Sequence, residues 1–222
     1  MAETVGADRE QTVRLSEIFF SLQGEAARSG IPTVFVRLTG CPLRCTWCDT
    51  EYAFTGGTTT RIDDVLAEVA RYPTRYVCVT GGEPLAQKTC LPLLRALCDA
   101  GYDVCLETSG ALDIVQVDAR VARIMDLKAP GSGESAKNLL SNIADLRATD
   151  EVKIVVASRA DYEWAKEMVS AHDLPARCDV VLSPVAGQLN PTDLAEWILA
   201  DGLNVRFQIQ LHKLLWSDAR GK

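Results

Sequence analysis

Three cysteines lie close together in the sequence, at Cys41, Cys45 and Cys48. Thiolates bind zinc and iron–sulfur clusters, so this spacing predicts a metal centre. Structural zinc takes four Cys or His ligands, but the chain has only two histidines, His172 and His212, and both lie far along the sequence. A second C-x-x-C motif, which is usual in a zinc ribbon, is absent. A zinc site would need a fourth cysteine from elsewhere, which the sequence leaves open.

The same three cysteines also suit an iron–sulfur cluster. A cubane cluster usually takes four thiolates, so three would leave one iron with an open coordination position for a substrate or cofactor. The remaining cysteines lie in apolar segments or near the start of a predicted helix, and we expect them to be small buried hydrophobic residues. They are Cys78, Cys90, Cys98, Cys105 and Cys178.

The composition is that of a soluble globular protein, with 47% hydrophobic and 24% charged residues. The formal net charge of −7 argues against sequence-independent binding of nucleic acid, which depends on basic patches. No apolar run approaches the roughly 20 residues of a membrane span, and the polar first dozen residues lack a signal-peptide core. We therefore expect a cytoplasmic protein with no nucleic-acid or membrane partner, folded as a single domain over residues 1–222 with a flexible segment at 1–12.

Short β-branched runs alternate with amphipathic segments, which predicts an α/β fold with a parallel sheet and helical crossovers. The expected strands are Thr33–Leu38, Arg75–Thr80, Asp103–Thr108, Val121–Leu127, Val152–Ala157, Asp179–Pro184 and Asn204–Leu211. The expected helices are Asp63–Arg71, Ala86–Ala100, Asn138–Leu146, Asp161–Ala171 and Thr192–Leu199. About six or seven strands could lie open as a doubly wound sheet or close partly into a barrel, and alternation alone does not decide between these.

Polar residues stand at the end of several predicted strands. In α/β proteins the carboxyl edge of the sheet carries the ligand site, whereas polar groups in the middle of a strand would be buried at a cost. This pattern favours a ligand site over ordinary loop starts. The polar residues at these ends are Glu83, Glu107, Thr108, Ser109, Asp126, Lys128, Ser183, Gln210 and His212.

The spacing Cys41-x3-Cys45-x2-Cys48, with Trp47 before the last cysteine, resembles the signature of radical S-adenosylmethionine (SAM) enzymes. The glycine-rich stretch Gly81–Pro84 strengthens the resemblance, because its glycines let the backbone approach a ligand closely. The resemblance implies a [4Fe-4S] cluster held by the three cysteines, with SAM bound at the open iron. The cofactors would supply a 5′-deoxyadenosyl radical, so no catalytic residue is assigned.

An ordered set of further motifs resembles one branch of these enzymes, the 7-carboxy-7-deazaguanine synthase family. The motifs run from Glu17 to Lys213 and comprise FFSLQGEAARSGIPTVFVRLTGC, CDT, TGGEP, ETSG, DLK, LSPV and QLHK. The resemblance implies conversion of 6-carboxy-5,6,7,8-tetrahydropterin to 7-carboxy-7-deazaguanine, through hydrogen abstraction at C6, ring contraction and loss of ammonia, in queuosine biosynthesis. It also implies Mg²⁺, a flavodoxin- or ferredoxin-like electron donor, a homodimer, and an incomplete, modified (β/α) barrel of about six parallel strands.

The resemblance assigns roles residue by residue. Thr50 matches a magnesium ligand, although Asp49 would be the choice by charge alone. Arg37 matches a substrate-binding arginine, and its planar guanidinium group can bind the carboxylate of a carboxypterin bidentately. The substrate-binding matches are Leu22, Gln23, Gly24, Arg37, Thr80 and His212. The SAM-binding matches are Trp47, Asp49, Gly82, Glu83, Glu107, Ser109, Asp126, Lys128, Ser183 and Pro184.

Two other functions stay open at the level of sequence. A glycyl-radical activating enzyme uses the same cysteine spacing and a similar length, but the LQGEAARSG and QLHK stretches favour a small-molecule substrate. A zinc-stabilised binding module, from a different functional class, would need the fourth metal ligand that the sequence does not supply.

Overall fold

The computed structural model describes residues 10–217 and 219–222. Most of the segment expected to be flexible, residues 1–12, therefore lies outside the described residues, and Thr12 already begins the first strand. The described residues form one nine-stranded sheet in the order β3-β1-β2-β4-β5-β6-β7-β8-β9. The strands are β1 (Thr12–Leu22), β2 (Pro32–Leu38), β3 (Thr58–Arg61), β4 (Tyr76–Gly81), β5 (Asp103–Thr108), β6 (Ala122–Asp126), β7 (Glu151–Val156), β8 (Asp179–Pro184) and β9 (Arg206–Phe207).

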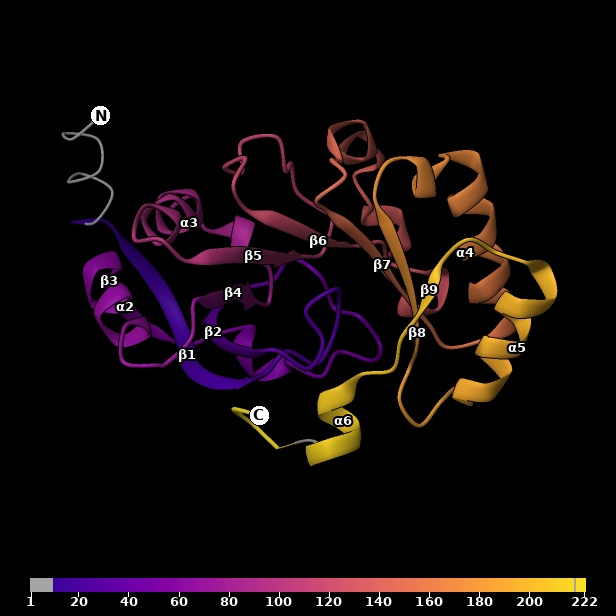
Figure 1. Cartoon of the computed structure of the whole chain (residues 1–222), viewed down its shortest axis with the longest axis horizontal. Coiled ribbons are helices and arrows are strands. Elements are labelled where there is room, and N and C mark those ends of the chain that lie inside the picture. Colours follow the sequence, from indigo (N-terminus) through magenta and orange to yellow (C-terminus); the bar gives the residue numbers. More distant parts are fainter. Residues whose placement is uncertain (1–9, 218) are drawn as a thin grey trace.

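The sheet is mostly parallel and does not close. Every neighbouring pair from β2 to β9 is parallel, whereas β1 pairs with β2 and β3 antiparallel. The two edges are β3 and β9, which Figure 1 shows at opposite sides of the molecule. The prediction of an incomplete, modified barrel is confirmed.

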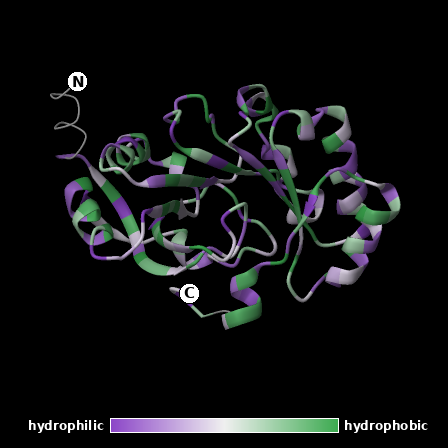
Figure 2. Cartoon of the chain, viewed as in Figure 1, coloured by the Kyte–Doolittle hydropathy of each residue, from purple (hydrophilic) through white to green (hydrophobic). Residues whose placement is uncertain are grey.

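Helices cover the outer face of the sheet. They are α2 (Ile62–Val69), α3 (Cys90–Asp99), α4 (Arg159–Ala171) and α5 (Pro191–Asp201). Helix α6 (Leu211–Trp216) lies apart from them near the C-terminus, and its first residue bonds to the turn after β1. Figure 1 shows α2 and α3 beside the N-terminal strands, and α4 and α5 beside β7 to β9. Both hydropathy colours alternate on α4 and α5 (Figure 2), as amphipathic surface helices require. None of the helices in the described ranges has the length and apolarity that a bilayer crossing demands.

The strand sequences place side chains alternately on the outer and inner faces of the sheet. Outward residues such as Val34, Val79 and Leu106 join the core beneath α2 and α3. A separate inner cluster contains Phe35, Cys78, Cys105 and Ile124, one from each of four neighbouring strands. This inner cluster forms the apolar floor below the carboxyl ends of the strands. The expectation of buried cysteines holds for Cys78, Cys90, Cys105 and Cys178, while Cys98 is half-buried.

The helix expected over Asn138–Leu146 is wrong. The structure has only a 3₁₀-helical turn there, Leu140–Asp145. The buried Asn142 side chain donates to the carbonyls of Gly110 and Leu112, and such side chain–backbone bonds compete with a helix. Leu140 is also exposed, so the segment has no continuous apolar stripe to bury.

The boundaries of other predicted elements also change. Helix α3 begins at Cys90 rather than Ala86, because Pro84–Ala86 is a separate 3₁₀ turn. The last strand is only Arg206–Phe207. The Gln208 amide still donates to the Leu182 carbonyl of β8, but the Gln208 side chain and the Leu211 amide bond to the turn after β1. Strands β1 and β3 and helix α6 were not expected. Strand β1 pairs antiparallel with β2 at one side of the sheet and so breaks the βα alternation on which the strands were predicted.

Candidate active site

A cavity of about 480 Å³ lies at the carboxyl ends of the parallel strands. The cysteine loop, the turn after β1, several strand ends and the start of α6 line it. Its lining includes all the predicted site residues except Glu83, Ser183 and Pro184. The predicted residues that line the cavity are Leu22, Gln23, Gly24, Arg37, Cys41, Cys45, Trp47, Cys48, Asp49, Thr50, Thr80, Gly82, Glu107, Ser109, Asp126, Lys128 and His212.

The cysteine loop presents Cys41, Cys45 and Cys48 to this cavity as three half-buried free thiols. Burial raises the pKa of each thiol above its usual value. The nearby Lys128 charge opposes this increase and favours the thiolate at all three positions. A bound metal must supply the remaining stabilisation, because only deprotonated sulfur is a strong ligand.

Backbone contacts hold the cysteine loop in place. The Arg44 amide donates to Glu134 Oε1 at 2.7 Å, and the Thr46 amide donates to the Ser132 carbonyl at 3.0 Å. On the other side, the Glu83 amide donates to the Gly40 carbonyl at 2.7 Å. The loop is thus fixed to the segment after β6 and to the glycine-rich end of β4.

The donor set fits an iron–sulfur cluster better than a single ion. In the described part of the chain, no three His, Cys, Asp or Glu side chains are arranged around one metal ion. A single zinc needs its ligands to converge on one point, whereas each thiolate of a cubane binds a different iron. The end of β4 packs directly against the start of the cysteine loop: a Cβ on Gly82 would lie 2.4 Å from the Gly40 oxygen and 2.7 Å from Cys41 Cβ. Three thiols that line one cavity without converging on a single point suit a cluster rather than one zinc ion.

Glu107 lies among residues matched to the substrate rather than to SAM. Its carboxylate accepts hydrogen bonds from Gln23 Nε2 at 3.1 Å and from Thr80 Oγ1 at 2.7 Å. Arg37 donates through Nε to Glu17 Oε1 at 2.8 Å. Within the described residues the two Nη groups of Arg37 have no hydrogen-bond partner, so the guanidinium can still bind a ligand carboxylate.

Asp49 connects the cysteine loop to the C-terminal helix. It accepts a hydrogen bond from Thr50 Oγ1 at 2.8 Å, and its Oδ2 lies 3.8 Å from both His212 Nε2 and Lys213 Nζ. Burial alone would raise the pKa of Asp49, but the His212 and Thr50 side chains and the Lys213 charge hold it well below its usual range. Because the Thr50 hydroxyl donates this hydrogen bond to Asp49, the lone pairs of Thr50 Oγ1 remain available to a cation.

Comparison with known proteins agrees with this geometry. The Radical SAM superfamily model matches residues 35–130. The chain is 48% identical to the 7-carboxy-7-deazaguanine synthase of Chlorobaculum tepidum, over 96% of this chain and 98% of that protein. It is 41% identical to the 7-carboxy-7-deazaguanine synthase of Koribacter versatilis, over 92% of this chain and 97% of that protein.

The chain belongs to the 7-carboxy-7-deazaguanine synthase family. Solved structures agree with this assignment. The crystal structure of QueE from Escherichia coli matches with a TM-score of 0.77 and 25% identity, covering 95% of this chain and 99% of that one. Streptococcus suis SuiB bound to S-adenosylmethionine matches with a TM-score of 0.56 at 14% identity, over 79% of this chain and 47% of that one. The second likeness shows the fold alone.

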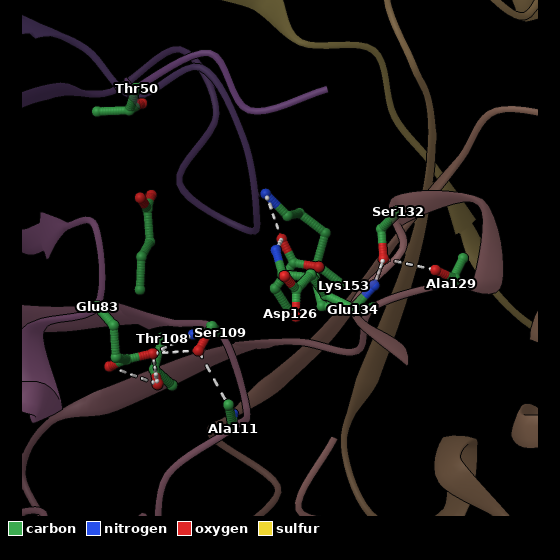
Figure 3. A network of polar contacts seen from close by, with 12 residues as sticks. Thr50, Glu83, Thr108, Ser109, Ala111, Asp126, Ala129, Ser132, Glu134 and Lys153 are labelled. Atoms are coloured by element: carbon green, nitrogen blue, oxygen red, sulfur yellow. Dashed lines mark hydrogen bonds and ion pairs between the residues drawn. The ribbon is translucent and has the colours of Figure 1, made fainter. Parts of the chain in front are cut away.

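In this member of the family, the Glu83 side chain lies outside the cavity lining. It is fully buried and accepts hydrogen bonds from the Leu85 amide, from Thr108 Oγ1, and from the amide and hydroxyl of Ser109. Figure 3 shows this cluster at the end of β5. The glutamate therefore ties the end of β4 to the end of β5. Ser183 and Pro184 are buried at the end of β8, also outside the lining, while Val185 contributes to it.

We expect Glu83→Gln to destabilise the protein. A glutamine keeps only one of the two accepting oxygens. Its NH₂ group would therefore face a backbone donor, either the Ser109 amide or the Leu85 amide. Leaving buried donors unpaired should lower the free energy of unfolding by about 2 kcal/mol. Urea unfolding checks this, with Glu68→Gln on the exposed face of α2 as the control, which should change stability by less than about 0.5 kcal/mol. An equal effect of the two substitutions would contradict the role of Glu83.

The cavity of this family member also contains polar residues to which the sequence analysis gave no role. They are Glu25, Lys153, Gln188, Lys213 and Lys222. Thr108 and Gln210, which were expected at strand ends without a specific role, line it as well. Among the residues without a role, Lys153 had a usable signal: it interrupts the apolar strand Glu151–Val156, and a lysine inside a parallel strand is rarely buried without a partner. Glu25 and Gln188 lie in turns and Lys213 in the short helix α6, where polar residues are ordinary.

Proposed function

We propose that the chain converts 6-carboxy-5,6,7,8-tetrahydropterin to 7-carboxy-7-deazaguanine with release of ammonia, as a lyase of queuosine biosynthesis. The observation that carries the proposal is that the three-cysteine loop and the residues matched to the pterin line one cavity. The similarity over nearly the whole chain supports the same substrate. A cavity of about 480 Å³ is also of the size that small-molecule sites have.

The cofactor side of the cavity comprises the cysteine loop and the ends of β4, β5 and β6. Cys41, Cys45 and Cys48 would hold the [4Fe-4S] cluster, and the Gly82 backbone can approach SAM because it has no side chain. When bound, the cluster and SAM supply one-electron reductive cleavage and a carbon radical that removes hydrogen from the substrate. The remaining SAM contacts proposed here are Trp47, Asp49, Ser109, Asp126, Lys128 and, through the backbone, Glu83, Ser183 and Pro184.

The substrate side comprises the turn after β1 and the inner faces of β2, β4 and β5. The Arg37 Nη groups would bind the carboxylate of the pterin bidentately. Gln23, Thr80 and Glu107 form one hydrogen-bonded set that can orient the polar edge of the ring. Leu22, Gly24 and His212 complete this side. The apolar floor of Phe35 and Ile124 would exclude water below the ring.

Thr50 is the proposed protein ligand of Mg²⁺, with water and substrate oxygens completing the coordination shell. We expect Thr50→Val to lower the apparent Mg²⁺ affinity by about tenfold or more, because valine keeps the shape but lacks the oxygen. Turnover measured against Mg²⁺ concentration checks this. Asp49→Asn is the comparison: if it abolishes the Mg²⁺ response while Thr50→Val retains it, the ligand is Asp49.

The direct test of the proposed function is anaerobic turnover with SAM, a reductant, Mg²⁺ and 6-carboxytetrahydropterin. The expected result is 7-carboxy-7-deazaguanine together with ammonia, detected by mass spectrometry. If 5′-deoxyadenosine forms without the deazapurine, the proposal is wrong and an activating enzyme becomes the better assignment. A colourless preparation with one tightly bound zinc would support the zinc-stabilised module instead.

We further propose a flavodoxin- or ferredoxin-like electron donor, a homodimeric assembly and a cytoplasmic location, with one domain over the whole chain. The family similarity supports a small reducing partner, because the cluster must be reduced before it can cleave SAM. Replacing the chemical reductant in the turnover assay with reduced flavodoxin tests this partner. Light scattering coupled to size exclusion tests the dimer.

A further inference from the structure

One largely buried lysine, whose side chain is 13% exposed, joins the two sides of the cavity. Lys153 lies on β7, and its Nζ donates a hydrogen bond to Glu25 Oε2. The same nitrogen lies 3.5 Å from Asp126 Oδ2, and the two residues are paired across β6 and β7. Figure 3 shows Lys153 and Asp126 side by side. Glu25 belongs to the turn after β1, whereas Asp126 ends the cofactor-side strand β6.

The three groups are all charged at neutral pH. Burial raises the pKa of Glu25, but the Lys153 charge and its hydrogen bond hold that pKa below its usual value. Burial likewise raises the pKa of Asp126, and Lys128 and Lys153 together hold it below its usual value. Burial lowers the pKa of Lys153, yet the carboxylates around it, Glu107 included, raise that pKa well above normal.

Loss of Lys153 would affect the two carboxylates differently. Asp126 would keep its ion pair with Lys128, at 2.9 Å. Glu25 would keep a neutral partner, Gln210 Nε2 at 2.6 Å, but no ion pair among the described residues. A buried carboxylate that loses its cation is strongly destabilised. The turn after β1 is therefore the part of the cavity that depends on Lys153.

Neutral contacts also hold this turn, mainly from the segment after β9. Gln208 exchanges two hydrogen bonds with the Ala26 backbone, at 2.6 and 3.0 Å, and the Leu211 amide donates to the Gly24 carbonyl at 3.0 Å. These contacts join the segment after β9 to the turn between β1 and β2 without extending the sheet. Two side chains of β7 contact the turn from within the sheet: Glu151 Oε1 accepts from the Ala27 amide at 2.9 Å, and Lys153 forms the ion pair with Glu25. Of these two, only Lys153 supplies a positive charge to the Glu25 carboxylate.

We propose that Lys153 is a positioning residue, which holds the Glu25 carboxylate and thereby fixes the turn 22–25 that forms the substrate side of the cavity. The identity of the ligand as a pterin rests on the proposed function, but the position of the turn does not. Lys153 acts in this proposal through Glu25, to which its Nζ is bonded. Its effect should therefore appear in the order of the turn and in substrate affinity, more than in the binding of SAM.

The test compares Lys153→Met with Lys166→Met in the anaerobic holoenzyme. Lys166 pairs with Glu163 and Asp201 on the outer surface and serves as the matched control. In Lys153→Met, hydrogen exchange at the amides of residues 25–27 should accelerate by about tenfold or more, with no change in Lys166→Met. The dissociation constant of 6-carboxytetrahydropterin should rise by about tenfold, and that of SAM by less than about threefold.

Unchanged exchange in the turn, or an equal loss of affinity for both ligands, would overturn the proposal. If Lys153→Met does not fold, Glu25→Gln and the double variant Glu25→Gln/Lys153→Met decide instead, because neither leaves an unpaired anion at position 25. If Lys153 acts only through the Glu25 carboxylate, its removal should change nothing further once that carboxylate is gone. Hydrogen exchange in the turn should then be similar in these two variants, and a further large acceleration in the double variant would contradict the role of Lys153. If the wild-type enzyme makes no deazapurine, the proposed function fails, while the exchange measurement still decides on Lys153.

Discussion

Cys45→Ala is expected to abolish both cluster binding and turnover. Cys45 is the middle cysteine of the loop, and its sulfur lines the cavity with those of Cys41 and Cys48. With two thiolates left, one more iron would lose its protein ligand, so the cluster should not be retained. Reconstituted protein should lose its brown colour and its tightly bound iron, and turnover should fall by at least about a thousandfold.

Cys98→Ala is the matched control for this loss. Cys98 is half-buried on α3 beside the outer core, and burial raises the pKa of its thiol to about 11. It therefore remains a neutral thiol at physiological pH and is a poor metal ligand. Its replacement should cost about 1 kcal/mol of stability and leave the iron content unchanged. Equal loss of activity in both variants with an intact cluster would contradict the assignment of the loop.

Gly82→Ala should produce the second largest effect, through geometry alone. The added Cβ would lie 2.4 Å from the Gly40 oxygen and 2.7 Å from Cys41 Cβ. Neither atom is the end of a flexible side chain, so the loop that carries Cys41 must move away from β4. A displacement of the order of 1 Å can cost about a hundredfold in rate when reacting groups are misplaced. We expect turnover to fall by about that factor, with weaker SAM binding measured at equilibrium.

Gly101→Ala separates this displacement from ordinary backbone strain. Gly101 follows α3 with a φ of +88°, and a Cβ there would meet no atom within 4 Å. Alanine at this position should cost about 1 kcal/mol of stability because of its left-handed conformation, but should leave iron content and SAM affinity unchanged. If the two glycine variants reduce SAM affinity equally, close approach at Gly82 is not the cause.

The sequence was sufficient for the features that depend on local spacing. Cys41, Cys45 and Cys48 lie on one short loop, so their convergence needs no long-range folding. The parallel strands from β2 to β8 were predictable because each is a short apolar run bounded by turns. The carboxyl ends of such strands meet at one edge, which is why Thr80, Glu107 and Asp126 were expected to share a cavity.

Only the tertiary structure could decide which polar groups face that cavity and which hold the fold. Glu83 and Glu107 both stand at strand ends, yet the Glu83 side chain is buried between β4 and β5 while Glu107 lines the cavity. Lys153 and Glu25 lie more than a hundred residues apart, and their ion pair exists because β7 and the turn after β1 meet across the open barrel. Local propensity carries no information on such pairings, since they depend on the order of strands in the sheet rather than on the residues beside them.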